Sequence, residues 1–125
     1  FGRMPAGKIL ILEDDPDVAW VYEKALREDG NSVTVCASFE QARDRLRVDR
    51  PDAVLTDVRV GEYNGLQLAL LFRSVSPAGA IMVVSGHDDA VIRREAAQMG
   101  ASFRLKPIQM SELTRFFGGT TNAAS

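Results

Sequence analysis

The sequence predicts a doubly wound α/β domain, in which helices cover both faces of a parallel sheet of five strands. Short apolar runs alternate with amphipathic segments along the 125 residues. Several of these runs are almost continuous in aliphatic residues, which is typical of strands buried on both faces of a parallel sheet. Right-handed crossovers then place the intervening helices on both faces. The expected strands are KILIL (8–12), SVTVC (32–36), AVLT (53–56), AIMVV (80–84) and SFRL (102–105).

Helix start and stop signals fill the intervals between these runs. Asp15 is a plausible N-cap before Pro16, and Gly30 is a natural end for the first helix. Ser38 with Gln41 forms a capping box for the second helix. The remaining expected helices start near Gly65, cover about 89–99 before Gly100, and form a short fifth segment that carries Leu113, Phe116 and Phe117.

Length and composition predict one domain over residues 7–118, with 1–6 as a tag or disordered start and 119–125 as a flexible tail or linker. A net charge of −2 and a pI near 5.4 give no basic footprint, so direct nucleic-acid contact by this domain is not expected. The single cysteine, Cys36, excludes an internal disulfide and fits a reducing, cytoplasmic location, with the thiol buried as a small hydrophobe. No apolar run approaches the roughly 20 residues of a membrane span.

Ionisable and hydroxyl groups follow the expected strands at their carboxyl ends, where function collects in doubly wound folds. Glu13 and Asp14 follow the first strand, Asp57 the third, Ser85 the fourth and Lys106 the fifth. Three neighbouring carboxylates repel one another unless a cation joins them, and an oxygen-only ligand set suits Mg²⁺. A lysine and a hydroxyl supply a charge and a donor for phosphoryl oxygens. The pattern therefore predicts a site for Mg²⁺ and a phosphoryl group.

Four motifs, ILILEDDP, LTDVRVGEYNG, VVSG and FRLKP, resemble in order and separation the receiver domain of two-component response regulators. The resemblance extends over about residues 8–117. It implies the flavodoxin-like (βα)5 sandwich with strand order 2-1-3-4-5. It also implies a cis Lys106-Pro107 bond and a glycine, Gly65, that opens the third helix.

The resemblance implies a chemical role for each matching residue of the site. Asp57 is the phosphoacceptor, which takes its phosphoryl group from the phosphohistidine of a sensor histidine kinase or histidine phosphotransfer protein. Glu13, Asp14 and Asp57 hold Mg²⁺ together with the backbone carbonyl of Arg59, and Lys106 pairs with the acyl phosphate. The domain is then a regulatory phosphoacceptor that promotes its own phosphorylation and dephosphorylation, rather than an enzyme.

Two further residues are expected to switch when Asp57 is phosphorylated. Ser85 matches the switch hydroxyl and Phe103 the aromatic whose rotamer reports the state. The face formed by the fourth helix, fifth strand and fifth helix would carry the signal to an effector domain or partner protein, or into a phosphorylation-dependent homodimer. Three arginines are candidates for a basic patch on this face: Arg93, Arg94 and Arg104.

The sequence departs from the family pattern in the loop after Asp57. Gly61 stands where the family usually has proline, so we expect the loop VRVGEYNG to be more mobile. Arg59, His87 and Gly86 are close in sequence to the expected phosphoryl site and are candidate modulators of dephosphorylation.

Two alternatives stay open at this point. A phosphatase of the haloacid dehalogenase type also uses a strand-end aspartate with Mg²⁺, but it needs a second aspartate where this chain has Arg59. The complete set of site residues argues against the second alternative, a pseudo-receiver that acts without phosphorylation. The cognate kinase, the stimulus and the output are not readable, nor is whether the domain stands alone, precedes an effector domain or belongs to a hybrid kinase.

Overall fold

The protein is described by a computed structural model that covers residues 7–61 and 63–121. The expected start, 1–6, and the last four residues of the expected tail, 122–125, lie outside the described residues. The strands are β1 (Lys8–Leu12), β2 (Ser32–Cys36), β3 (Ala53–Asp57), β4 (Arg59–Val60), β5 (Tyr63–Asn64), β6 (Ala80–Ser85) and β7 (Ser102–Leu105). The helices are α1 (Pro16–Glu28), α2 (Phe39–Asp49), α3 (Leu66–Val75), α4 (Ala90–Gln98) and α5 (Met110–Thr121).

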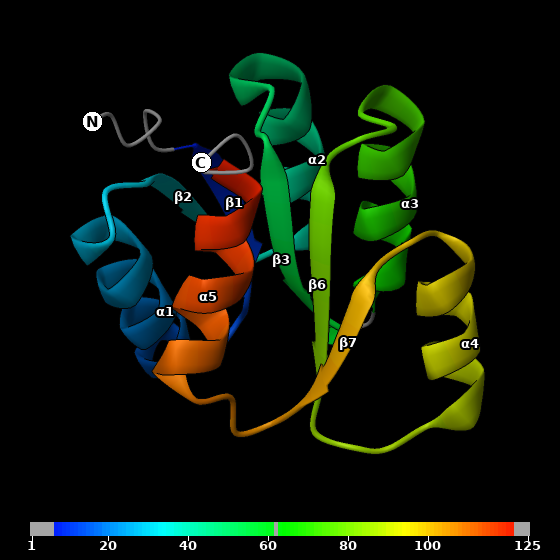
Figure 1. Cartoon of the computed structure of the whole chain (residues 1–125). Helices are drawn as coiled ribbons and strands as arrows, with labels where there is room; N and C mark the ends of the chain where they lie inside the picture. The colour runs from blue at the N-terminus through cyan, green and yellow to red at the C-terminus, as the bar shows by residue number, and fades with distance from the viewer. Residues whose placement is uncertain (1–6, 62, 122–125) are drawn as a thin grey trace.

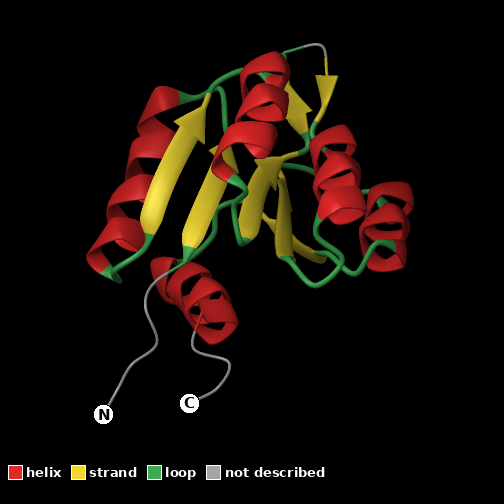
Figure 2. Cartoon of the chain, turned by 90° about the horizontal axis from the view of Figure 1, so that it is seen from above, coloured by secondary structure: helices red, strands yellow, loops and turns green. Residues whose placement is uncertain are grey.

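Within these ranges, a five-stranded parallel sheet has the order β2-β1-β3-β6-β7 (Figure 1). Counted along the sheet strands alone this is 2-1-3-4-5, so the predicted fold and strand order are confirmed. Figure 2 shows helices on both sides of the sheet. Parallel pairing brings the carboxyl ends of the strands to one edge, because Leu12 pairs with Thr56 and Asp57 pairs with Val84. That edge is where the predicted site residues were expected to gather.

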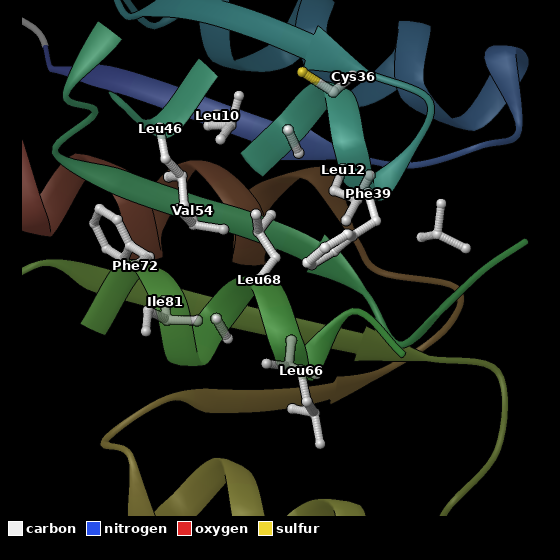
Figure 3. Packing of buried hydrophobic residues seen from close by; sticks show 14 of the residues in the cluster. Leu10, Leu12, Cys36, Phe39, Leu46, Val54, Leu66, Leu68, Phe72 and Ile81 are labelled. Carbon is white, nitrogen blue, oxygen red and sulfur yellow. The ribbon is translucent and has the colours of Figure 1, made fainter. Parts of the chain in front are cut away.

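Two apolar clusters fill the space between the sheet and its helices. One lies under α2, α3 and α4 and includes Leu12, Val54 and Phe72 (Figure 3). The other lies under α1 and α5 and includes Leu26 and Phe117. Complete burial of a side chain of this size contributes about 1.5–3 kcal/mol. The two clusters together therefore fix the sheet that presents the strand ends.

The predicted helix boundaries depend on caps that the structure contains. The Asp15 carboxylate accepts from the N–H groups of Asp17 and Val18, and the Ser38 hydroxyl accepts from that of Gln41. Gly30 and Gly100 follow α1 and α4 with positive φ angles of 96° and 73°. Such backbone is accessible to glycine at little cost, which explains why these helices end there.

Strands β3 and β6 end in Asp57 and Ser85, which the sequence placed at the ends of these strands. Two local features differ from the sequence-based expectation. The fifth helix is not short, because α5 reaches Thr121 and takes in three residues assigned to the tail. The loop after Asp57 holds the antiparallel pair β4–β5, with Gly61 at φ 60° in the connection. A positive φ suits glycine and not proline, whose ring fixes φ near −65°.

On α1, Tyr22 is buried and Trp20 is exposed, with Lys24 over its ring. Two further expectations from the sequence are confirmed. Cys36 is buried. The Lys106-Pro107 peptide bond is cis. Among the described residues, no helix combines the length and the apolar character needed to cross a bilayer.

Candidate functional site

The structure brings the three predicted carboxylates together at the carboxyl edge of the sheet. Glu13 directly follows β1, and its N–H donates to the carbonyl of Cys36 at the end of β2. Asp57 ends β3. One carboxylate oxygen from each of Glu13, Asp14 and Asp57 lies within 4.8 Å of the others. Glu13 and Asp57 are buried, with 2% and 8% of their surface exposed, whereas Asp14 is exposed. The cluster is thus open to solvent on the Asp14 side.

Lys106 forms ion pairs with both buried carboxylates. Its Nζ lies 2.7 Å from Asp57 Oδ2 and 3.0 Å from Glu13 Oε1. The backbone N–H of Lys106 donates to the Ser85 carbonyl at 2.8 Å, which ties the end of β7 to the end of β6. Burial lowers the pKa of the Lys106 ammonium, but the hydrogen bonds to Asp57 and Glu13 raise it by more, so the pKa stands above its ordinary value. Lys106 therefore stays charged throughout the physiological range.

Glu13 is the buried anchor of the cluster. Burial raises the pKa of its carboxyl above the ordinary value, and hydrogen bonds from Lys106 and from the Asp15 N–H offset only part of this effect. A further cation near this carboxylate would stabilise its charged form. Glu13 is consequently suited to ligation, directly or through water.

Backbone amides of the β3–β4 region complete the surroundings of the acids. The N–H of Arg59 donates to Asp57 Oδ1 at 3.2 Å, and that of Gly61 donates to Asp14 Oδ2 at 3.3 Å. The second contact is absent from the sequence-based prediction, because nothing in a linear pattern pairs residues 14 and 61. It joins the acidic pair after β1 to the ribbon after β3.

The donor set fits the Mg²⁺ expected from the sequence. Three carboxylates from two strand ends offer only hard oxygen ligands, and one of them is solvent-exposed, which leaves room for bound water. The excess of negative charge is offset here by one ammonium group, that of Lys106. Glu13, Asp14 and Asp57 are the side chains that could hold the ion. The Arg59 carbonyl remains a predicted fourth contributor.

Ser85 lies at the same edge but bonds within its own loop. Its Oγ donates to the His87 carbonyl at 2.9 Å and accepts from the His87 N–H at 3.1 Å. In the described contacts, His87 takes part through its backbone, and its side chain is exposed. A Cβ built on Gly86 would meet no atom within 4 Å, so the loop has open space beside it. The Ser85 hydroxyl would therefore have to rotate to reach a group on Asp57.

The switch candidate Phe103 lies on β7 and is half-buried against the α2–α4 cluster. The Arg93 guanidinium stacks over its ring, and Arg93 also pairs with Asp88. Arg104 pairs with Glu112. The predicted basic patch is therefore corrected in one respect: two of its three arginines have acidic partners, which a residue count along the sequence does not reveal.

Thr56 and Gly65 fix the backbone around Asp57. The Thr56 hydroxyl donates to the Gly65 carbonyl at 3.3 Å, and the Gly65 N–H donates to the Val58 carbonyl at 2.6 Å. A Cβ on Gly65 would overlap the backbone carbonyl oxygen of Asp57. Gly65 thus opens α3, as predicted, because the chain passes too close to β3 for a side chain. Its φ is −61°, so left-handed backbone is not the reason.

Comparison with known proteins identifies the family. The model of the family described as the response regulator receiver domain matches residues 9–117. The chain belongs to this family. A curated relative, the DNA-binding transcriptional regulator NtrC of Proteus hauseri, is 29% identical to the receiver domain over 113 residues. The match covers 87% of this chain but 23% of that protein, so the receiver domain spans about a quarter of its relative's length.

Solved structures agree with this assignment. A response regulator receiver protein from Sinorhizobium medicae is 28% identical, with a TM-score of 0.81 over 96% of this receiver domain and 98% of that chain. The beryllofluoride-activated NtrC4 receiver domain dimer has a TM-score of 0.84 over 94% of this domain and 98% of that chain. Its identity is 18%, so this likeness shows the fold alone. Membership of the family supports a regulatory role.

Proposed function

We propose that this receiver domain accepts a phosphoryl group on Asp57 from the phosphohistidine of a histidine kinase or histidine phosphotransfer protein. The observation that carries the proposal is the arrangement of charges around Asp57, which has two further carboxylates within 4.8 Å and an ammonium 2.7 Å away. The ammonium can stabilise a phosphoryl group on this buried aspartate, and the carboxylates can hold a cation that stabilises the same group.

In the proposed reaction, a carboxylate oxygen of Asp57 forms a bond to phosphorus as the phosphorus–nitrogen bond of the phosphohistidine breaks. The electron pair of that bond leaves with the imidazole. Lys106 already contacts Oδ2, and its ammonium stabilises negative charge on the phosphoryl oxygens as the transfer proceeds. Mg²⁺ held by Glu13, Asp14 and Asp57 would supply further neutralisation of the same oxygens. The product is an acyl phosphate, which carries more charge than the aspartate it replaces.

The switch follows from this added charge. Rotation of the Ser85 hydroxyl away from His87 would let it donate to a phosphoryl oxygen, and Phe103 would then turn into the space behind it. The repacking would be transmitted through α4, β7 and α5, as a shift between two conformers. That face would bind a downstream effector domain, a partner protein or a second copy of the domain. The NtrC4 receiver domain is one that forms a dimer.

Intact-mass measurement with acetyl phosphate tests the proposal directly. Wild-type protein should gain one phosphoryl group when Mg²⁺ is present and none when it is chelated. Asp57→Asn should remain unmodified, and Lys106→Ala should be modified much more slowly. Modification of Asp57→Asn would place the acceptor elsewhere, whereas Mg²⁺ binding without any adduct from either acetyl phosphate or a phosphorylated kinase would favour a pseudo-receiver. Steady turnover of phosphomonoesters would favour a phosphatase, although Arg59 stands where that class has its second aspartate.

We also propose that Arg59, Gly86 and His87 influence the lifetime of the acyl phosphate. Arg59 and His87 lie in the segments after Asp57 and Ser85, and both side chains are exposed. Gly86 leaves open space through which water can approach. Decay of the phosphoryl adduct in Arg59→Ala, Gly86→Ala and His87→Ala should differ from decay in the wild type. Unchanged rates in all three variants would rule out this role.

A further inference from the structure

A groove of about 760 Å³ lies between the C-terminal halves of α2 and α3, remote from the phosphorylation site. The two helices are neighbours on the same face of the sheet (Figure 1). Pro51 and Asp52, which precede β3, line one end of the groove, whereas Asp57 ends the same strand. At about 3.3 Å per residue, the groove and Asp57 are separated by about 16 Å of strand.

The floor and one wall of the groove are apolar. Leu46 and Phe72 form the buried floor, and Figure 3 shows them at the same end of the cluster under α2 and α3. Leu71 and Val75 form the α3 wall, one helical turn apart. These two side chains are 40% and 71% exposed. Covering these solvent-exposed apolar side chains with another apolar surface lowers the free energy.

The opposite wall is positively charged. Arg43 and Arg47 line the groove from successive turns of α2, with the i, i+4 spacing of one helix face, and Arg50 lines it from the C-cap that follows the helix. Arg43 pairs with Asp44 on the surface, and no acidic partner of Arg47 or Arg50 is described in residues 7–61 and 63–121. Asp52 is the one acid in the lining, and its carboxylate accepts from the Lys8 N–H. Three arginines beside two engaged carboxylates, Asp44 and Asp52, are a local excess of positive charge in a chain whose net charge is −2.

We propose that this groove binds an acidic amphipathic helix of a partner protein. Apolar side chains of that helix would cover Leu71 and Val75, while its carboxylates would face the three arginines. Arg43 and Arg47 lie about 6 Å apart along α2, which is one helical turn, and Arg50 follows at the end of the helix. Carboxylates one turn apart on a second helix match Arg43 and Arg47. A small anion or a nucleic-acid backbone would use the arginines but leave the apolar wall exposed, so an amphipathic segment fits both walls better.

Arg50 permits a test that is independent of folding. It caps α2 with φ 48° and ψ 63°, a left-handed conformation that glycine adopts at lower cost. Replacement by glycine therefore removes a charge from the groove while relieving the backbone. Arg50→Gly should raise the melting temperature and yet weaken binding, a combination that damage to the fold cannot produce.

Fluorescence anisotropy with synthetic peptides measures the interaction. The probe is a labelled peptide of about 15 residues, long enough to form a helix, with leucine at i, i+3 and i+4 positions and glutamate on the adjoining face. Arg47→Glu should raise its Kd at least about tenfold, and Arg50→Gly and Val75→Ser should each raise it severalfold. Arg115→Glu, an exposed arginine on α5 across the sheet, should leave the Kd unchanged. Asp57→Asn should also bind the peptide normally, since the groove does not use the phosphorylation site.

Two control peptides separate this mode from weaker alternatives. A peptide with lysine for glutamate and one with serine for leucine should each bind at least about tenfold less tightly than the probe. If the serine peptide bound as tightly as the probe, the groove would recognise only negative charge, as it would in binding a polyanion. That result would overturn the proposal. Wild-type affinity in Arg47→Glu, or no binding of the probe to the wild type, would overturn it as well.

Discussion

The guanidinium carbon of Arg93 on α4 lies 4.5 Å from the centroid of the Phe103 ring on β7. The ring is half-buried against the cluster under α2, α3 and α4, and Arg93 also pairs with Asp88 in the loop before α4. A cation–π contact at a partly exposed site contributes about 0.5–1 kcal/mol. The inward turn of Phe103 in the proposed switch would break this contact, so the contact opposes the switch.

Removal of the Arg93 charge should therefore favour the inward rotamer of Phe103. Loss of about 0.5–1 kcal/mol corresponds to an increase of about two- to fivefold in the ratio of inward to outward conformers. Fluorine NMR of protein labelled with fluorophenylalanine would measure this ratio in Arg93→Gln, with Phe103→Leu used to assign the signal. Arg94→Gln, the exposed neighbour, should match the wild type. A ratio in Arg93→Gln that does not move would show that the contact has no part in the switch.

Lys106 is expected to stabilise the fold as well as to serve phosphorylation. Without its ammonium, the buried carboxylates of Glu13 and Asp57 would face each other unpaired, so Lys106→Met should lower the free energy of unfolding at pH 7 by about 1–3 kcal/mol. Addition of Glu13→Gln to that variant should restore part of the loss, because it removes one of the two charges. Urea denaturation without Mg²⁺ measures both effects. Lys24→Met, on the exposed side of α1, should change stability by less than about 1 kcal/mol. An equal loss in both lysine variants would contradict the pairing argument.

The Cys36 thiol should be unreactive in the folded protein. Burial at the end of β2 raises its pKa to about 11 from the ordinary value of 9.0. Thiolate is then about one part in a thousand at pH 8, and the side chain is inaccessible besides. The reaction of native protein with a thiol-specific disulfide reagent should be far slower than the reaction in urea. Equal rates would show that the thiol is exposed or ionised.

The raised pKa of Cys36 should make the folded protein less stable at alkaline pH. Below pH 9 the thiol is protonated whether the chain is folded or unfolded, so its stabilising contribution is fully present. Between pH 9 and about 11 the unfolded chain loses the proton first, and the contribution is lost as the pH rises through the folded pKa. Cys36→Ala should lose less stability than the wild type over this range, as measured by urea denaturation at each pH.

Two glycines of the site provide a matched pair of substitutions. A Cβ at Gly65 would overlap the Asp57 carbonyl oxygen, whereas one at Gly86 would meet nothing within 4 Å. Gly65→Ala should therefore cost about 1–3 kcal/mol through displacement of the β3 end, and it should slow phosphorylation of Asp57. Gly86→Ala should leave stability within about 0.5 kcal/mol of the wild type. Denaturation and adduct formation measured on both proteins would test this, and similar losses in the two variants would disprove the steric explanation.

Much of the fold was predictable because its signals are local. The capping side chains of Asp15 and Ser38 accept hydrogen bonds from N–H groups no more than three residues away. Uninterrupted aliphatic runs indicate the buried strands. The features that were missed have no local sequence signal. The β4–β5 pair turns at Gly61, whose N–H contacts Asp14, 47 residues away. The acid partners of Arg93 and Arg104 were missed because charge pairing on a surface depends on side-chain direction.

The sequence by itself determined the alternation of strands and helices, the ends of most helices, and the residue types that follow each strand, since these arise from local backbone preferences and burial periodicity. Tertiary structure decided which of those residues meet. The parallel strand order β1-β3-β6-β7 placed the Lys106 ammonium within 3.0 Å of both Glu13 and Asp57, although 93 and 49 residues separate them along the chain. It also placed α2 beside α3 and so formed a groove with one cationic and one apolar wall. The physical reason is that charge neutralisation and apolar burial depend on distance in space, which a linear pattern does not contain.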